Sequence, residues 1–122
     1  MAHALAAEAY GALTPNLTSP TRAEALVFAD VTRRLESIFS DPQASHASKI
    51  AVLHDNRRLW LAAAAASADD GNALPEGLRV GLLNLAAFVD RQTSALLRGE
   101  GSVTVLSEIN RRVIGGLSAG AT

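Results

Sequence analysis

The sequence predicts an all-α protein, a small single-domain helical bundle of four to five helices. The chain of 122 residues contains 24 Ala and 17 Leu, whereas β-branched and aromatic residues are sparse, so the summed propensity favours helix. Apolar residues recur at spacings of three and four along most of the chain, which is the period of an amphipathic helix. No segment shows the alternation of a strand, and no hairpin signal competes with this prediction.

The composition sets the size of the core and excludes several classes of protein. The large apolar side chains suffice for one modest core, so we expect residues 1–117 to form a single helical domain and residues 118–122 a flexible tail. The longest apolar run, Leu59 to Ala66, has eight residues, whereas a membrane span needs about 20. We therefore expect no membrane insertion.

The net charge and the cysteine content exclude further classes of protein. The formal net charge of −1 gives no long-range attraction to nucleic acid or to an anionic membrane. The absence of cysteine excludes disulfides, thiolate zinc sites and cysteine nucleophiles, and is compatible with a reducing cytoplasm. The N-terminus lacks the basic start of a Sec signal peptide, so we expect a cytoplasmic protein.

Turn and cap residues divide the chain into five predicted helices, about 2–13, 20–39, 45–67, 75–98 and 102–116. Pro15 ends the first helix, because the residue before a proline is disfavoured in the α region. The second helix begins either at Pro20 with Ser19 as its cap, or with Thr21 and Glu24 as a capping box. In the third helix, five consecutive alanines favour helix formation and allow a neighbouring helix to approach closely.

The last two predicted helices differ in the strength of their apolar stripes. Leu78, Leu82, Leu85 and Val89 form the cleanest stripe, so we expect the fourth helix to be central and the most buried. The segment 99–102 separates it from the fifth helix, which the Gly115-Gly116 pair is expected to end.

No group of residues has the spacing of a catalytic or metal site. His46 and His54 lie roughly 80° apart around a helix, which is a poor arrangement for zinc ligands. Phosphate-binding loops and nucleophile elbows are missing. The sequence therefore predicts no enzyme, no cofactor and no metal. The polar residues that an alternative small hydrolase or transferase would use are His46, His54, Asp55, Asp69 and Asp70.

Ten of the eleven basic residues are arginine, and six of them form adjacent pairs. Guanidinium groups bind carboxylate or phosphate, so these pairs are candidates for contact with a protein partner or with RNA. Single-strand binders stack bases on aromatic residues, which make up only 4% of this chain, and this argues against RNA. The pairs are Arg33-Arg34, Arg57-Arg58 and Arg111-Arg112.

Trp60, the single tryptophan, lies at helical spacing and is interpreted as a core anchor. The residues around it and the loop that follows resemble the FlaF flagellar biosynthesis family of alphaproteobacteria. The matching residues are Leu53, Asn56-Arg57, Leu59-Trp60, Gly71-Asn72, Leu74-Pro75, Leu78-Arg79, Leu85 and Phe88-Val89. Weaker support comes from Tyr10, Ser19-Pro20, Arg22 and Glu24, where Thr21 is an insertion, and from Ile109-Asn110 and Gly116-Leu117. The resemblance spans about residues 10–117.

The resemblance implies an all-helical cytoplasmic protein that binds flagellin and acts beside the FlbT-type flagellin regulator. We expect a chaperone-like factor that couples flagellin synthesis to export and filament assembly, with a partner-binding groove formed by Tyr10, Trp60, Leu74 and Leu78 and with Arg57 and Arg79 on its rim. The alternative is a post-transcriptional regulator that contacts flagellin mRNA directly through the arginine pairs. A third possibility is a helical module without a groove that acts only as an oligomer.

Overall fold

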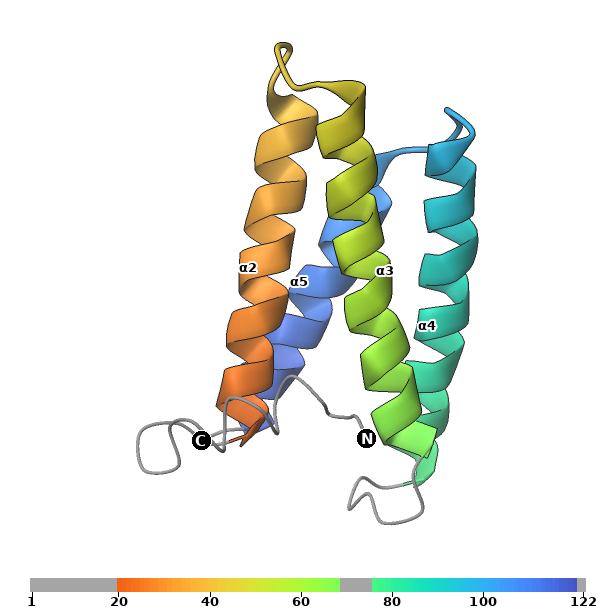
Figure 1. Cartoon of the computed structure of the whole chain (residues 1–122). Helices are drawn as coiled ribbons and strands as arrows, with labels where there is room; N and C mark the ends of the chain where they lie inside the picture. Colours follow the sequence, from red (N-terminus) through yellow and green to blue (C-terminus); the bar gives the residue numbers. More distant parts are fainter. Residues whose placement is uncertain (1–19, 69–75, 121–122) are drawn as a thin grey trace.

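The structure is a computed structural model that describes residues 20–68 and 76–120. These residues form four helices: α2 (Pro20–Ser40), α3 (His46–Ala68), α4 (Glu76–Leu97) and α5 (Val103–Gly120). Consecutive helices run in opposite directions and form an elongated bundle (Figure 1). The predicted all-α bundle is confirmed. The predicted helix 2–13 lies outside the described residues.

The four helices do not pack equally. α2 packs against α5 and α3, α3 also packs against α4, and α4 meets α5 only slightly. Figure 1 accordingly shows α5 behind α2 and α3, with α4 beside α3. Large side chains from all four helices meet in one core: Phe28, Val31, Leu35, Val52, Leu53, Leu59, Trp60, Val89 and Leu106.

Local hydrogen bonds explain where the helices begin and end. The Ser45 hydroxyl accepts a hydrogen bond from the Ser48 backbone N–H at 3.0 Å and so caps α3. After α4, Gly99 has a φ of 81° and the Glu100 N–H donates to the Ala95 carbonyl at 2.8 Å, which is the Schellman arrangement. Ser102 caps α5 through a 3.2 Å bond from the Thr104 N–H.

Two predictions about these helices are wrong. α5 continues through Gly115 and Gly116 to Gly120, so the predicted end of this helix at residue 116 is wrong, whereas the flexibility of the tail from residue 118 stays a prediction. A glycine costs a helix only about 1 kcal/mol relative to alanine, and Val113 and Ile114 anchor α5 on the core just before the pair. Residues 121–122 lie outside the described part.

The second wrong prediction is that α4 is the central helix. Among its described side chains only Val89 and Thr93 are fully buried, while Leu85 is 36% exposed. α4 packs mainly on α3, and among the described helices only α5 makes a further, slight contact with it. A clean apolar stripe therefore shows which side of a helix faces its neighbours, but not how many neighbours it has.

Candidate functional site

Trp60 connects three helices from within the core. Its side chain is 2% exposed, its ring meets that of Phe28 edge to face at 5.5 Å, and its Nε1 donates a hydrogen bond to Asn110 Oδ1 at 2.8 Å. The interpretation of Trp60 as a core anchor is confirmed, and it is not an exposed contact residue.

A buried amide pair extends this contact. Asn110 Nδ2 donates to Asn56 Oδ1 at 2.7 Å, and both side chains are fully buried. Because the indole N–H only donates, it fixes the direction of the whole chain of hydrogen bonds. Asn56 Nδ2 is left as a buried donor without an acceptor, which costs stability.

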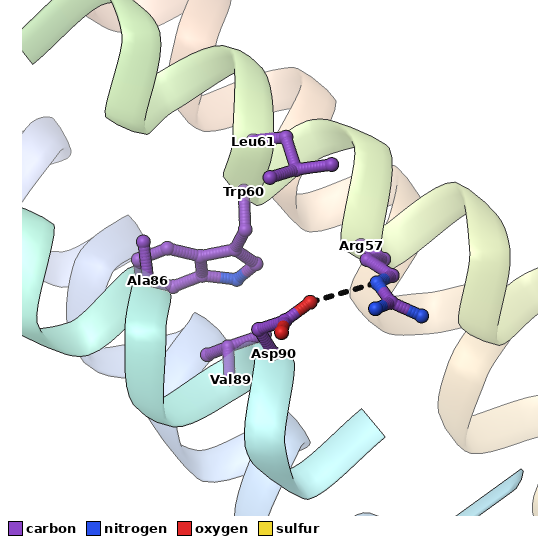
Figure 2. A pocket seen from close by; sticks show the side chains of 6 residues that line it. All are labelled: Arg57, Trp60, Leu61, Ala86, Val89 and Asp90. Carbon is purple, nitrogen blue, oxygen red and sulfur yellow. Dashed lines mark hydrogen bonds and ion pairs between the residues drawn. The ribbon is translucent and has the colours of Figure 1, made fainter. Parts of the chain in front are cut away.

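A shallow hollow lies where Trp60 meets α4 (Figure 2). Arg57 Nε donates to Asp90 Oδ1 at 2.8 Å at one side of the hollow, and the indole lies beside Ala86. This partly exposed ion pair contributes at most about 1 kcal/mol, and it shows that Arg57 of α3 lies opposite Asp90 of α4. The lining residues are Arg57, Trp60, Leu61, Ala86, Val89 and Asp90.

Below the hollow, apolar side chains are exposed on both helices. Arg57 lies opposite Asp90 and Leu61 lies near Ala86, so later residues of α3 lie opposite earlier residues of α4. Leu61 is 57% exposed and Val80 is 47% exposed. We call this surface the α3–α4 face. It comprises Leu61, Ala64, Ala65 and Ala68 of α3 and Val80, Leu83 and Ala87 of α4.

A second concave surface lies along the seam of α2 and α5, and we call it the α2–α5 groove. It encloses about 490 Å³ and contains Leu26, which is 58% exposed. Two ion pairs, Arg33 with Asp30 and Arg111 with Glu36, lie along it, so it is far more polar than the α3–α4 face. The lining residues are Leu26, Ala29, Asp30, Thr32, Arg33, Glu36, Arg111 and Ile114.

Two carboxylates of α2 have shifted pKa values in opposite directions. Hydrogen bonds from Arg111 and Ser107 lower the pKa of Glu36, because they stabilise its charged form. Burial raises the pKa of Glu24, because the loss of water around its carboxylate disfavours the charged form.

The structure brings some of the predicted site residues together. Arg57 and Trp60 line the same hollow, and Arg79 lies on α4 beyond Val80 at the far end of the α3–α4 face. Tyr10 and Leu74 lie outside the described residues, as does the side chain of Leu78.

Sequence reasoning missed Leu61 as a surface residue. The second half of α3 is apolar on every side, so its sequence has no periodicity that shows which side faces outward. Asp90, the partner of Arg57, carried no signal, because their pairing depends on the register of two helices.

The described members of the set considered for catalysis form no hydrogen bond or ion pair with one another. His46 and His54 are both exposed on α3, and Asp55 accepts a hydrogen bond from Arg34 at 3.0 Å. Asp69 and Asp70 lie outside the described residues. The arginine pairs are also largely occupied, because Arg33, Arg34, Arg57 and Arg111 each bind a carboxylate.

No helix in the described ranges is long and apolar enough to cross a membrane. Curated proteins and solved structures gave no match to this chain. The model of the family described as "Flagellar protein FlaF" matches residues 6–117, which is nearly the whole chain. The residues around Trp60 that carried the resemblance fall inside this match, and the chain belongs to the FlaF family of flagellar proteins.

Proposed function

We propose that this protein is a cytoplasmic, chaperone-like factor that binds monomeric flagellin and couples flagellin synthesis to export and filament assembly. The observation that carries the proposal is the α3–α4 face, an exposed apolar surface on a chain that belongs to a flagellar family. In this proposal the protein acts together with the FlbT-type regulator, and we assign no surface to contact with that regulator.

The shape of the α3–α4 face suits a helix. Two antiparallel helices leave a seam between them, and the apolar side of a third helix packs into such a seam. Alanines at positions 64, 65 and 68 keep the α3 side of the seam low, so the backbone of a partner helix can approach closely. The terminal helices of flagellin, which polymerise in the filament, are clients with this property.

The test is a titration of the full chain with monomeric flagellin, followed by calorimetry at several temperatures. We expect saturable binding with a negative heat-capacity change, because apolar surface is buried. Calorimetry is preferable to tryptophan fluorescence, since Trp60 is already buried in the free protein.

A matched pair of variants locates the contact. Leu61→Asp places a charge on the α3–α4 face and is expected to weaken flagellin binding at least about tenfold, because it removes apolar burial and leaves a charge to be desolvated. Leu26→Asp makes the same change at an equally exposed leucine in the α2–α5 groove and should leave the affinity unchanged. If Leu26→Asp alone weakens binding, the groove is the site.

A parallel titration with the flagellin mRNA leader tests the alternative function. Direct RNA contact predicts binding that falls steeply with salt, because neutralised phosphates release counterions. RNA binding without flagellin binding would contradict the proposal.

A further inference from the structure

One asparagine interrupts the apolar stripe of each of two helices, α3 and α5. The core-facing residues of α5 recur at spacings of three and four: Val103, Leu106, Asn110 and Val113. Those of α3 recur at the same spacings: Val52, Asn56, Leu59 and Ala63. Both asparagines are fully buried, at positions where a leucine would pack without the cost of removing an amide from water. Stability alone therefore does not explain the two amides.

The two helices that carry these amides are joined only through side chains. No Cα of α3 lies within 8 Å of a Cα of α5 along the described helices, whereas α2 packs against both. The bonds that join them run from Trp60 to Asn110 at 2.8 Å and from Asn110 to Asn56 at 2.7 Å. Hydrogen bonds depend on distance and direction, whereas apolar contacts are not directional, so these bonds restrict the axial position of α5.

A shift of α5 along its axis shows the difference between the two kinds of contact. A shift by one helical turn brings other apolar residues of the stripe into the core, but it moves Asn110 about 5 Å from Asn56 and Trp60. The indole N–H and the Asn110 amide would then be buried without partners, which is costly. In coiled coils, one buried asparagine fixes the register in this way and lowers the stability.

The contact on the outer side of α5 restricts this shift less. Arg111 and Ser107 bind Glu36 of α2, but the Arg111 side chain is 61% exposed, so water can replace its ion pair. The unpaired Asn56 Nδ2 in the core shows that the amide pair does not repay its own desolvation in full.

We infer that Asn56 and Asn110 are a specificity-determining pair, which selects one axial position of α5 among those that apolar packing allows and lowers the stability of the fold. Because Asn110 also binds Trp60, the same pair fixes the indole that lines the hollow beside the α3–α4 face. The two asparagines are therefore positioning residues.

The first measurement is stability. Asn56→Leu or Asn110→Leu alone leaves the remaining amide without its partner in the core, so each is expected to lower the urea midpoint. The two substitutions together leave the Trp60 N–H unpaired in place of Asn56 Nδ2, and both leucines add apolar packing. We expect the midpoint of this leucine double variant to equal or exceed that of the wild type.

The second measurement is the axial position of α5. The chain has no cysteine, so Ala65→Cys on α3 and Thr104→Cys on α5 provide two defined sites for spin labels, both exposed. The two helices run in the same direction, and Asn110 lies level with the stretch from Asn56 to Trp60. The labelled sites are therefore separated along the axis by about 13 helical residues, roughly 20 Å, and a shift by one turn changes this by about 5 Å.

Electron–electron resonance between the labels gives the distribution of their distances. We expect one narrow distribution for the labelled chain with both asparagines, and a broadened or shifted distribution for the labelled leucine double variant. Thr32→Val with Thr93→Val is the matched control, because it also replaces two buried polar groups, but each hydroxyl donates to a carbonyl of its own helix. Its distribution should stay narrow.

Three results would overturn the inference. An unchanged narrow distribution in the leucine double variant would show that apolar packing alone fixes α5. A urea midpoint below that of the wild type, or failure of this variant to fold, would show that the amides stabilise the fold and do not select among positions. An equally broad distribution in the threonine control would show that the loss of any buried polar group has this effect. None of these measurements uses flagellin, so the inference and the proposed function fail independently.

Discussion

At the scale of single residues, Trp60 is the point where the bundle is held together. It contacts Phe28 of α2, binds Asn110 of α5 and lines the hollow against α4. An indole supplies both a large apolar body and one N–H, so a single side chain contributes apolar packing and also sets the direction of a buried hydrogen-bond chain. The same residue therefore specifies which faces of the helices meet.

Trp60→Phe tests this role. The substitution keeps an aromatic ring but leaves Asn110 Oδ1 without its donor in the core, and we expect a loss of about 1–3 kcal/mol in the free energy of unfolding. Urea denaturation followed by circular dichroism measures it. Leu61→Ala, at an exposed leucine, serves as the control and should change stability far less. If Trp60→Phe and the wild type have the same free energy of unfolding, the hydrogen bond from Trp60 to Asn110 does not stabilise the fold.

Glu24 is predicted to make the protein less stable as the pH rises. The pKa of Glu24 in the folded state is raised above the ordinary value of about 4.3. The protonated carboxyl therefore stabilises the folded protein in acid, and this stabilisation is lost as the pH rises through the folded-state pKa. Glu24→Gln should therefore raise the melting temperature at pH 7 and have little effect near pH 4.

Glu36 has the opposite pKa shift and serves as the control for Glu24. Its pKa is lowered, so its contribution is present above the unfolded value and is lost as the pH falls through the folded value. Glu36→Gln should lower the melting temperature at pH 7 and lose this effect in acid. The same pH dependence for both variants would contradict the assignment.

At the scale of elements, α5 is a helix that tolerates two adjacent glycines. A Cβ built at Gly115 or Gly116 meets nothing within 4 Å, and neither residue has a positive φ. Gly115→Ala and Gly116→Ala are therefore expected to stabilise the protein by about 0.5–1 kcal/mol each in thermal melts, because alanine restricts the unfolded chain. Gly99→Ala is the control and should destabilise, since Gly99 has a φ of 81°.

The helix boundaries could be predicted because they depend on local chemistry. Proline, serine caps and the segment 99–102 place the ends of α2, α3 and α4 within about one residue of their predicted positions. The end of α5 could not be predicted, because the contacts of Val113 and Ile114 with the core outweigh the local preference of glycine. Packing against the core, and not the glycine pair, determines where α5 ends.

At the scale of the whole molecule, the pairing of helices creates the candidate site. α4 packs mainly on α3 and only slightly on α5, and in the described part of the chain Leu61 and Val80 are exposed on these two helices. Sequence reasoning named Arg57 and Arg79 for the rim of a groove; Arg57 lines the hollow and Arg79 lies on α4 beside Val80, and their role in binding stays a prediction. It could not assign Leu61 to the surface, because an apolar helix such as α3 has no periodicity to show which side faces outward.

The central claim is that the α3–α4 face is the surface that binds flagellin. The most direct measurement is the affinity of Leu61→Asp for monomeric flagellin, compared with that of Leu26→Asp under the same conditions. The account predicts a loss of at least about tenfold for Leu61→Asp and wild-type affinity for Leu26→Asp. Wild-type affinity for a folded Leu61→Asp variant would contradict it.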